Sequence, residues 1–561
     1  MSAHQAFRRQ PVPQQVAQKY QALTIPAPTR GIIQSENFAY MKPGGAMICD
    51  NWIPTMRGVK LRGGCVRWCE LPEVTPVISS FEYQNASQHK MFAANATKLY
   101  DVTAGGAPTL VVGGQTSGNY AASQMANASG YHMMVVNDAG DAPLRYDGSA
   151  WTVLNTGQIT GPPGSAVVAG ENLVHVWKYK NRWFFIELNS MNAWYLPLDA
   201  IQGALLQIPL SGAAKKGGKL LFGATWSLDA GDGIDDKCVF VTDLGEVIIF
   251  TGSDPGSTTN SAPWHQEGLF QIPPPMGMNA HATVGGDLLI ATLDGLVPIS
   301  SALTKTADQL DLGMVSYNIR SMWRNEAIDK REMPWSMKRW DEYGGMFVTW
   351  PGGVPGKRYC AAMNTGTNAW ARFPGWDATC FILMRGEMFF GTQDGIIMQA
   401  DRTGYDDGKP YTATLVGNWG IFQQQASTTT WRQSRASFSA RAGEPFQPQL
   451  SATTDYVITL PPPPAPGYDP GIQDVWDQGE WGPDMGPPPP PVPTPEEKDD
   501  YAQWDQPSLG APVVRNTGWV SIGLTGYTHA PIVQVTVAQQ ARPDVELIAI
   551  DATFERMGVN V

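Results

Sequence analysis

The sequence predicts a mainly β protein, in which a β-propeller of about seven blades carries an additional β domain built from the N- and C-terminal segments. Three observations lead to this prediction. Short apolar segments joined by tight turns recur along the chain, several of them at intervals of about 50 residues. The 561 residues include 59 Gly and 45 Pro, which suits many short strands better than long helices. Aromatic residues make up 10% of the chain, so these strands can bury a large core.

Three segments share one design, an apolar strand, a turn that contains glycine, and a second apolar strand. They are KCVFVTDLGEVIIFTG (237–252), GGDLLIATLDGLVPIS (285–300) and EMFFGTQDGIIMQA (387–400). A threonine stands three residues before each turn glycine, at Thr242, Thr292 and Thr392, so the intervals are 50 and 100 residues. Such a hairpin turn needs positive φ at both central positions, as Asp-Gly allows. A repeat of this length, with several short strands per unit, is typical of propeller blades, each of which buries its apolar faces against its neighbours.

A skipped copy is expected near 342–345, where RWDEYGGMFVTW (339–350) turns at Gly344-Gly345. Looser hairpins occupy 91–102, 144–153, 182–197 and 359–373, and the last two share Asn-Ala-Trp after the turn, ending in Trp194 and Trp370. A two-sheet sandwich with coincidental spacing is the alternative, but the fixed positions of threonine and glycine favour the propeller.

The domain boundaries follow from where this pattern starts and stops. We expect the propeller over 76–405, with a helix inserted near 308–328, where apolar residues recur at helical spacing. Residues 1–75 are predicted to form an N-terminal arm and strands of the second β domain. Residues 406–460 and 508–561 alternate apolar and polar positions and supply the rest of that domain. The intervening 461–507 is a proline-rich acidic loop.

Charge and cysteine content restrict the function. The net charge is −12 and the pI is about 5.1, which argues against tight nucleic-acid binding through phosphate neutralisation, although a mildly acidic wall would let a duplex slide past it. No apolar run is long enough to span a bilayer, and the N-terminus lacks the apolar region of a secretory signal. Six cysteines in a chain of this length do not form a disulfide framework, so we expect folding in a reducing cytoplasm.

No catalytic or metal-binding motif is present, so we predict no enzyme activity, no catalytic residue, no metal and no cofactor. The seven histidines show no paired ligand spacing, and Cys65 and Cys69 lack a second cysteine pair. The acidic run DAGDGIDD (229–236) lacks the ligand spacing of an EF-hand and is better explained as a loop than as a Ca²⁺ site. RYDGSAWT (145–152) departs from the sialidase Asp-box, because it lacks the leading Ser and its Trp comes one residue early.

One segment resembles a known family. FAYMKPGGAMICDNWIPTMRGVKLRGG (38–64) is similar to the N-terminal signature of the tail hub (nozzle), or packaged-DNA stabilisation, proteins of short-tailed bacteriophages. The matching order here is Asn51-Trp52-Ile53-Pro54, then Gly58, Lys60, Arg62 and Gly63. The resemblance continues in order through 179–218, 245–255, 389–395, APIVQV and ELIAIDATFE, but it does not include the proline-rich loop.

The resemblance implies a structural subunit of the virion tail, assembled in the host cytoplasm. Such a subunit forms a homohexameric ring below the portal and its adaptor, extends the DNA ejection channel, helps to retain packaged DNA, and presents surfaces to tail fibre, spike or needle proteins. Double-stranded DNA passes through the channel only transiently. The alternative is a propeller enzyme or glycan-binding protein acting on host surface polysaccharide. The residues predicted to contact partners are Trp52, Arg57, Lys60 and Arg62 near the N-terminus, and Trp476, Trp481 and Trp504 in the proline-rich loop.

Overall fold

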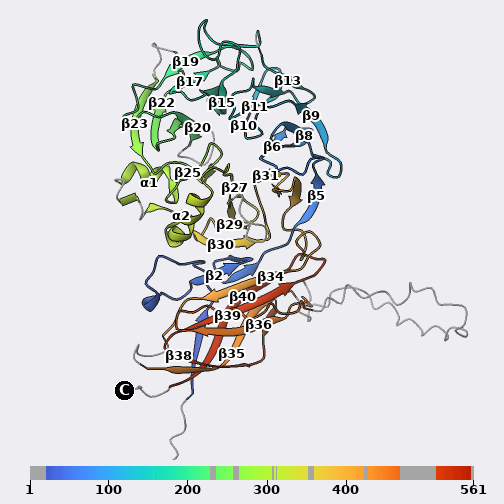
Figure 1. The fold of residues 1–561 in the computed structure, drawn as a ribbon, viewed down its shortest axis with the longest axis vertical. Coiled ribbons are helices and arrows are strands. Elements are labelled where there is room, and N and C mark those ends of the chain that lie inside the picture. Colours follow the sequence, from blue (N-terminus) through green and yellow to red (C-terminus); the bar gives the residue numbers. More distant parts are fainter. Residues whose placement is uncertain are drawn as a thin grey trace, which may run out of the picture.

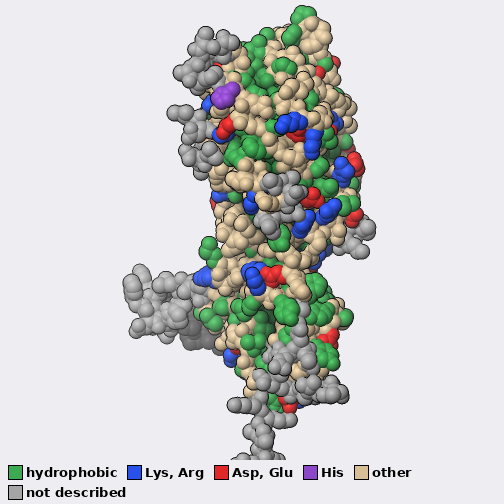
Figure 2. Space-filling model, turned by 90° about the vertical axis from the view of Figure 1, so that its left-hand side faces the viewer, with side chains coloured by type: hydrophobic (Ala, Val, Ile, Leu, Met, Phe, Trp, Pro, Cys, Tyr) green, Lys and Arg blue, Asp and Glu red, His purple; other side chains and the backbone are tan. Residues whose placement is uncertain are grey.

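A computed structural model shows the protein as two β bodies, a ring of small sheets and a second β domain beneath it (Figure 1). Viewed from the side, the two form one narrow column (Figure 2). The structure describes residues 20–155, 157–227, 236–256, 264–305, 309–310, 313–350, 359–421, 427–441, 443–467 and 513–556.

The ring contains six self-contained sheets. The first two are β6 (Ser79–Gln84), β7 (His89–Ala94), β8 (Lys98–Asp101) and β9 (Thr109–Gly113), then β10 (Tyr120–Asn127), β11 (Gly130–Asn137), β12 (Leu144–Tyr146) and β13 (Trp151–Val153). The next two are β15 (Leu173–Tyr179), β16 (Arg182–Glu187), β17 (Asn192–Tyr195) and β19 (Leu206–Pro209), then β20 (Leu220–Trp226), β21 (Lys237–Thr242), β22 (Glu246–Thr251) and β23 (His265–Gln271). The last two are β24 (His281–Val284), β25 (Asp287–Ala291) and β26 (Leu296–Pro298), then β31 (Cys380–Met384), β32 (Glu387–Gly391), β33 (Ile396–Gln399) and β5 (Val66–Glu70). A short parallel pair, β14 (Ile159–Thr160) and β18 (Gly203–Ala204), lies beside the third sheet in the chain.

A seventh set of strands completes the ring. It consists of β27 (Met337–Trp340), β28 (Gly345–Thr349), β29 (Tyr359–Asn364) and β30 (Ala369–Pro374). Its first strand contacts β24 on one side and β31 on the other, so it lies between the fifth and sixth self-contained sheets. The β-propeller is therefore confirmed, and the predicted count of about seven is reached when β27–β30 is counted as a blade.

The last blade combines the two ends of the ring. Its outermost strand, β5, pairs with β33, with Glu70 opposite Ile396. The predicted boundary at residue 75 is wrong here, because β5 belongs to the propeller and not to the second β domain. The outer edge of β33 would otherwise be unpaired, and β5 covers it.

The three turn threonines lie at equivalent turns, between the second and third strands of their blades, and each forms a hydrogen bond within its turn. Thr292 Oγ1 donates to Gly295 O at 2.6 Å, and Oγ1 of Thr242 and of Thr392 accepts the N–H of the residue four positions on, at 3.0 and 3.1 Å. The expected backbone geometry is wrong, however. Three residues, 243–245, join the strands of the first hairpin, and among them only Gly245 has a positive φ, of 80°. In the third hairpin, Gly395 has a positive φ of 80° and Asp394 before it does not. The threonine supplies hydrogen bonds that close this longer loop.

Two of the proposed equivalences between repeats are wrong, because the segments that were matched occupy different strand positions in their blades. Gly344-Gly345 connects the first and second strands of its blade, whereas the three threonine turns connect the second and third. Trp194 lies on the third strand of one blade and Trp370 on the fourth strand of another. Every hairpin of a blade has the same alternation, so pattern alone does not fix the strand position.

The helical insertion is shorter than expected. Helix α2 spans Arg320–Asp329 after a 3₁₀ turn at Tyr317–Ile319, and a further helix, α1, spans Ile299–Thr304. Trp323 is the buried anchor of α2 and its indole nitrogen donates to Thr292 O at 2.8 Å. Part of 308–328 lies outside the described residues.

The second domain is a β-sandwich made from both ends of the chain. One layer holds β1 (Gln21–Pro26), β3 (Trp52–Pro54), β4 (Val59–Leu61), β35 (Thr429–Ala440), β37 (Val513–Asn516), β38 (Val520–Gly526) and β40 (Val545–Arg556). The other holds β2 (Ala46–Asp50), β34 (Tyr411–Gly417), β36 (Pro448–Thr454) and β39 (His529–Val537), and a 3₁₀ turn at Phe38–Tyr40 precedes it in the chain. Leu415 and Val533 from one layer and Phe438 and Leu547 from the other belong to one buried cluster between them. The prediction that the two chain ends build an extra β domain is confirmed.

Candidate functional site

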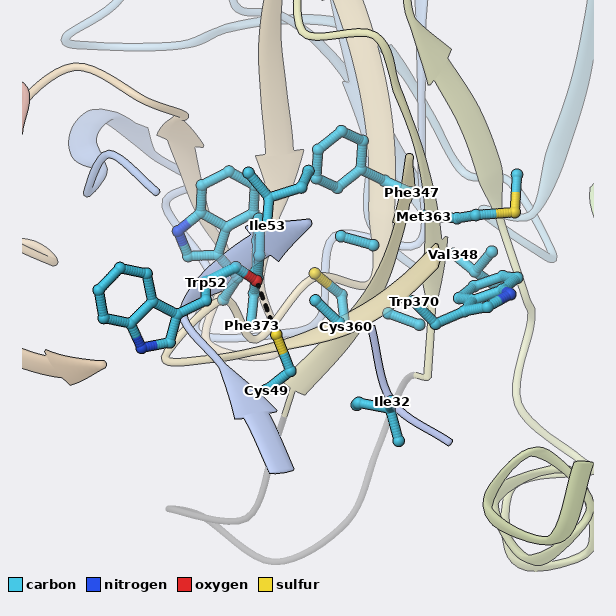
Figure 3. Packing of buried hydrophobic residues seen from close by; sticks show 14 of the residues in the cluster. Ile32, Cys49, Trp52, Ile53, Phe347, Val348, Cys360, Met363, Trp370 and Phe373 are labelled. Atoms are coloured by element: carbon cyan, nitrogen blue, oxygen red, sulfur yellow. Dashed lines mark hydrogen bonds between the residues drawn. The ribbon is translucent and has the colours of Figure 1, made fainter. Parts of the chain in front are cut away.

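The junction between the two bodies is one continuous sheet. β30 of the propeller runs parallel to β2 of the second domain, so that β27-β28-β29-β30-β2-β34-β39-β36 form eight strands in one order. At the crossing, Arg372 Nε and Nη2 donate to the two carboxylate oxygens of Asp50 at 2.7 and 2.8 Å. Buried side chains from both bodies pack around it, including Trp52, Phe347 and Trp370 (Figure 3). The junction is a shared core, and a hinge there would have to break it.

A buried arginine forms the centre of this junction. The Arg62 side chain is 0% exposed and binds Asp406 in a bidentate manner, Nη1 to Oδ1 at 2.8 Å and Nη2 to Oδ2 at 2.6 Å. Its Nε donates to Asn51 Oδ1 at 2.7 Å, and the guanidinium lies 4.2 Å from the ring centroid of Tyr411. The charge is thus fully paired where solvent is absent, which is the condition for a buried ion pair to be tolerated.

A second carboxylate of the junction is less well compensated. Asp401 is 8% exposed, and its Oδ1 accepts the N–H of Gly63 at 2.8 Å while Oδ2 pairs with the half-exposed Arg542 at 2.8 Å. Burial raises the pKa of Asp401 to about 6, even though Arg542 and the Gly63 N–H favour the charged form. Asp401 therefore loses its proton near neutral pH, against the cost of desolvation.

The residues predicted to contact partners separate into three groups. Trp52 and Arg62 are 0% exposed and belong to the internal junction, so their prediction as partner contacts is wrong. Arg57 is 82% exposed at the tip of the β3–β4 hairpin, and Lys60 is 34% exposed and pairs with Asp544 at 2.7 Å. Trp476, Trp481 and Trp504 lie outside the described residues.

The sequence analysis did not identify Asp401 or Asp406 as junction residues. Both stand in DRTGYDD (401–407), which reads as an ordinary polar loop after a strand. Each lies more than 300 residues from its N-terminal partner, Gly63 or Arg62, so no local pattern connects them.

The axis of the propeller is the second feature that could carry function. The inner strands of the seven blades line three adjoining cavities, of about 450, 320 and 230 Å³, which we call the channel. The first and second share Asn119, and the second and third share Asn279. Asn279 reaches across from the β24 blade and donates to Asn119 Oδ1 and Tyr120 O, each at 3.0 Å. We call the 320 Å³ space the middle cavity.

The described lining of the channel offers no evident catalytic group. The carboxylates there are Glu82 in the middle cavity and Asp138 and Glu332 in the largest one. Glu82 Oε1 already contacts His89 Nδ1 at 2.9 Å. Burial lowers the pKa of His281 to about 4, so this ring, which stacks on Phe222 at 4.4 Å, is neutral at pH 7.

The described part of the chain shows neither a cluster of metal-binding side chains nor a reactive thiol. No group of three or more His, Cys, Asp or Glu residues there could hold a metal ion. Of the acidic run 229–236, only Asp236 is described. All six cysteines are unpaired and buried, and burial raises the pKa of each thiol, to about 12 for Cys69 and Cys360. None of the described helices is both long enough and apolar enough to cross a membrane.

Comparison with known proteins finds only distant similarity to solved structures. No protein-family model matches the chain, and no curated protein does. Among solved structures, YCF48 from Cyanidioschyzon merolae is 13% identical, covering 60% of this chain and 98% of that one, with a TM-score of 0.36. YCF48 bound to a D1 peptide (12% identity, 59% and 93% coverage, TM-score 0.33) and Saccharomyces cerevisiae Sqt1 (12%, 63% and 96%, TM-score 0.35) are similar to the same extent. Likeness at this level carries no argument about function.

Proposed function

We propose that this protein is a structural subunit of the tail nozzle of a short-tailed bacteriophage. Six copies form a ring that extends the DNA ejection channel below the portal and its adaptor and helps to retain packaged DNA. The subunit performs no reaction, assembles in the host cytoplasm and remains in the virion tail. Its partners are its own copies, the adaptor, and tail fibre, spike or needle proteins.

The observation that carries this proposal is the rigid coupling of the two bodies. A ring wall under pressure from packaged DNA needs subunits that keep one shape. Here a single eight-stranded sheet runs through both bodies. The ion pair Asp50–Arg372 is formed within this sheet, and the buried pair Arg62–Asp406 lies beside it, where Arg62 also donates to Pro374 O of β30. Cyclic assemblies repeat one heterologous interface, and they close only when each subunit presents its two surfaces at a fixed angle. An enzyme whose site lies in the propeller would have no need for this coupling.

The exposed surface of the second domain supplies candidate contacts. The β3–β4 hairpin tip presents Met56, which is 76% exposed, beside Arg57 at 82%. Tyr40 is 73% exposed in the preceding segment, and hydrophobic side chains are visible across this domain in Figure 2. An exposed apolar side chain next to a poorly paired arginine is typical of interface hot spots. The hairpin tip also lies inside the segment that resembles the nozzle signature.

The charge balance suits a channel wall. With a net charge of −12, the subunit does not attract phosphates, so a duplex passing a six-fold ring would meet weak repulsion instead of adhesion. The propeller axis itself is not the DNA path in this proposal, because Asn279 spans it and its three cavities are of small-molecule size.

The test is assembly on a portal–adaptor complex, imaged by negative-stain electron microscopy. We expect six-fold rings that cap the adaptor when the full-length protein is mixed with it. The double variant M56D/R57E should lose capping while keeping the melting temperature of the wild type. Lys216→Glu, an exposed propeller position, is the matched control and should still cap. A stable monomer that ignores the adaptor, and binds or cleaves host polysaccharide instead, would overturn the proposal.

A further inference from the structure

The middle cavity contains a lysine without a counter-ion. Lys338 lies on β27, the inner strand of its blade, and lines this cavity. Its ammonium makes no ion pair or hydrogen bond with a described residue, whereas Lys90, for example, pairs with Asp101 at 2.9 Å. The single carboxylate of the cavity lining, Glu82, contacts His89 instead.

The surroundings of Lys338 make this isolation costly. Lys338 is an exposed residue at the wall of the cavity. Partial desolvation there lowers the pKa of its ammonium, and the nearby Glu82 opposes this change. An enclosed ammonium without an anionic partner is disfavoured relative to one in bulk water. His281, also in the lining, is neutral at pH 7 and contributes no competing charge. An anion that entered the cavity would remove the cost.

Two hydroxyl groups in the same lining are also available. The side chains of Ser123 and Ser336 form no hydrogen bond with a described residue, whereas Asn119 bonds to Asp138 and Ser80 to Cys380. At about 320 Å³, the cavity is at the lower end of the range for small-molecule sites. It suits a molecule of monosaccharide size that carries one anionic group and several hydroxyls.

We propose that the middle cavity binds a small hydroxylated anion, whose carboxylate or phosphate group pairs with Lys338 and whose hydroxyl groups bond to Ser123 and Ser336. The site is separate from the hairpin tip that the proposed tail function uses, and of the junction sheet only the edge strand β27 borders it. It takes one molecule per subunit.

Isothermal titration calorimetry on the full-length protein tests this with three sugars of nearly equal size. D-glucuronate supplies the carboxylate, D-glucose 6-phosphate supplies the phosphate, and D-glucose is the neutral control. We expect at least one of the two anions to bind with a Kd of about 1 mM or lower, and glucose to bind about tenfold more weakly or not at all. The anion with the lower Kd shows whether the site prefers a carboxylate or a phosphate group.

Variants of Lys338 separate a specific site from general attraction. Lys338→Met should reduce binding of the anion about tenfold or more, and Lys338→Arg should retain much of it. Lys216→Met removes an exposed lysine outside the channel and should leave binding unchanged. Melting temperatures confirm that each variant is folded. The proposal is overturned if neither anion binds, if glucose binds equally well, or if Lys338→Met binds the anion as tightly as the wild type does.

Discussion

Replacing Asp401 by Asn should stabilise the protein at neutral pH, although it removes one side of an ion pair. The pKa of this carboxyl group rises from 3.8 to about 6 because the folded chain buries it. A shift of one pKa unit corresponds to about 1.4 kcal/mol. The rise from 3.8 to about 6 therefore means that keeping the carboxylate charged costs the folded state about 3 kcal/mol at pH 7. Asn has no charge to desolvate, and its Oδ1 can still accept the N–H of Gly63.

The sign of the pH dependence follows from where the proton is held. The folded state binds the Asp401 proton more tightly than the unfolded chain does, so wild-type stability falls as pH rises from about 4 to about 6 and then levels off. At pH 4 the protonated Asp401 and the variant Asn are both neutral, so the two proteins should melt at similar temperatures. At pH 7.5 Asp401→Asn should melt at a higher temperature than the wild type.

Differential scanning fluorimetry from pH 4 to pH 8 measures this difference directly, since every other titrating group is common to both proteins. Asp341→Asn is the matched control, because the Asp341 side chain is 75% exposed and its carboxylate loses little hydration on folding. Its melting difference from the wild type should stay constant with pH. If the Asp401→Asn difference is also constant, or becomes more negative as pH rises, the reasoning about a desolvated carboxylate is refuted.

Three further substitutions test the fold. Arg62→Met leaves Asp406 buried without a counter-charge and should lower the free energy of unfolding by about 3–5 kcal/mol in urea denaturation. Lys60→Met, two residues earlier, should cost about 1 kcal/mol or less, and equal losses would argue against the junction as described. Thr292→Val removes the hydroxyl that closes its turn and should lower the free energy of unfolding by about 1 kcal/mol. The control Thr97→Val, whose exposed hydroxyl has no such role, should change it little. A larger loss for Thr97→Val than for Thr292→Val would disprove the role of Thr292 in its turn. Gly31→Ala should abolish soluble expression, since the new Cβ would lie 2.4 Å from Trp370 O at a φ of 66°. Gly114→Ala, with φ of 75° but open space around it, should remain soluble and fold with a loss of about 1 kcal/mol.

The sequence predicted those features that local pattern determines. Thr242, Thr292 and Thr392 mark equivalent turns because each threonine bonds to its own loop, within four residues. The closure of the ring by β5 could not be predicted in this way, because its partner Ile396 lies more than 300 residues ahead and both strands have ordinary alternation.

The errors at the site have a similar cause. Trp52 and Arg62 belong to residue types that are enriched at interfaces, and they do lie at an interface, but it is the one between the two bodies of the same chain. The sequence shows the type of each residue, but it does not show whether another part of the same chain or a separate protein packs against that residue. Lys338 is the opposite case, because KRW after Met337 looks like a solvated edge until the ring encloses it.

The joining of residues 66–70 to the final blade has a consequence for biosynthesis. An early strand must wait on the ribosome until its partner has been translated, so the ring cannot lock during most of elongation. β4 has to wait still longer, for β40, which begins at Val545. A nascent chain that stops before residue 545 therefore lacks the strand that pairs with both β4 and β35.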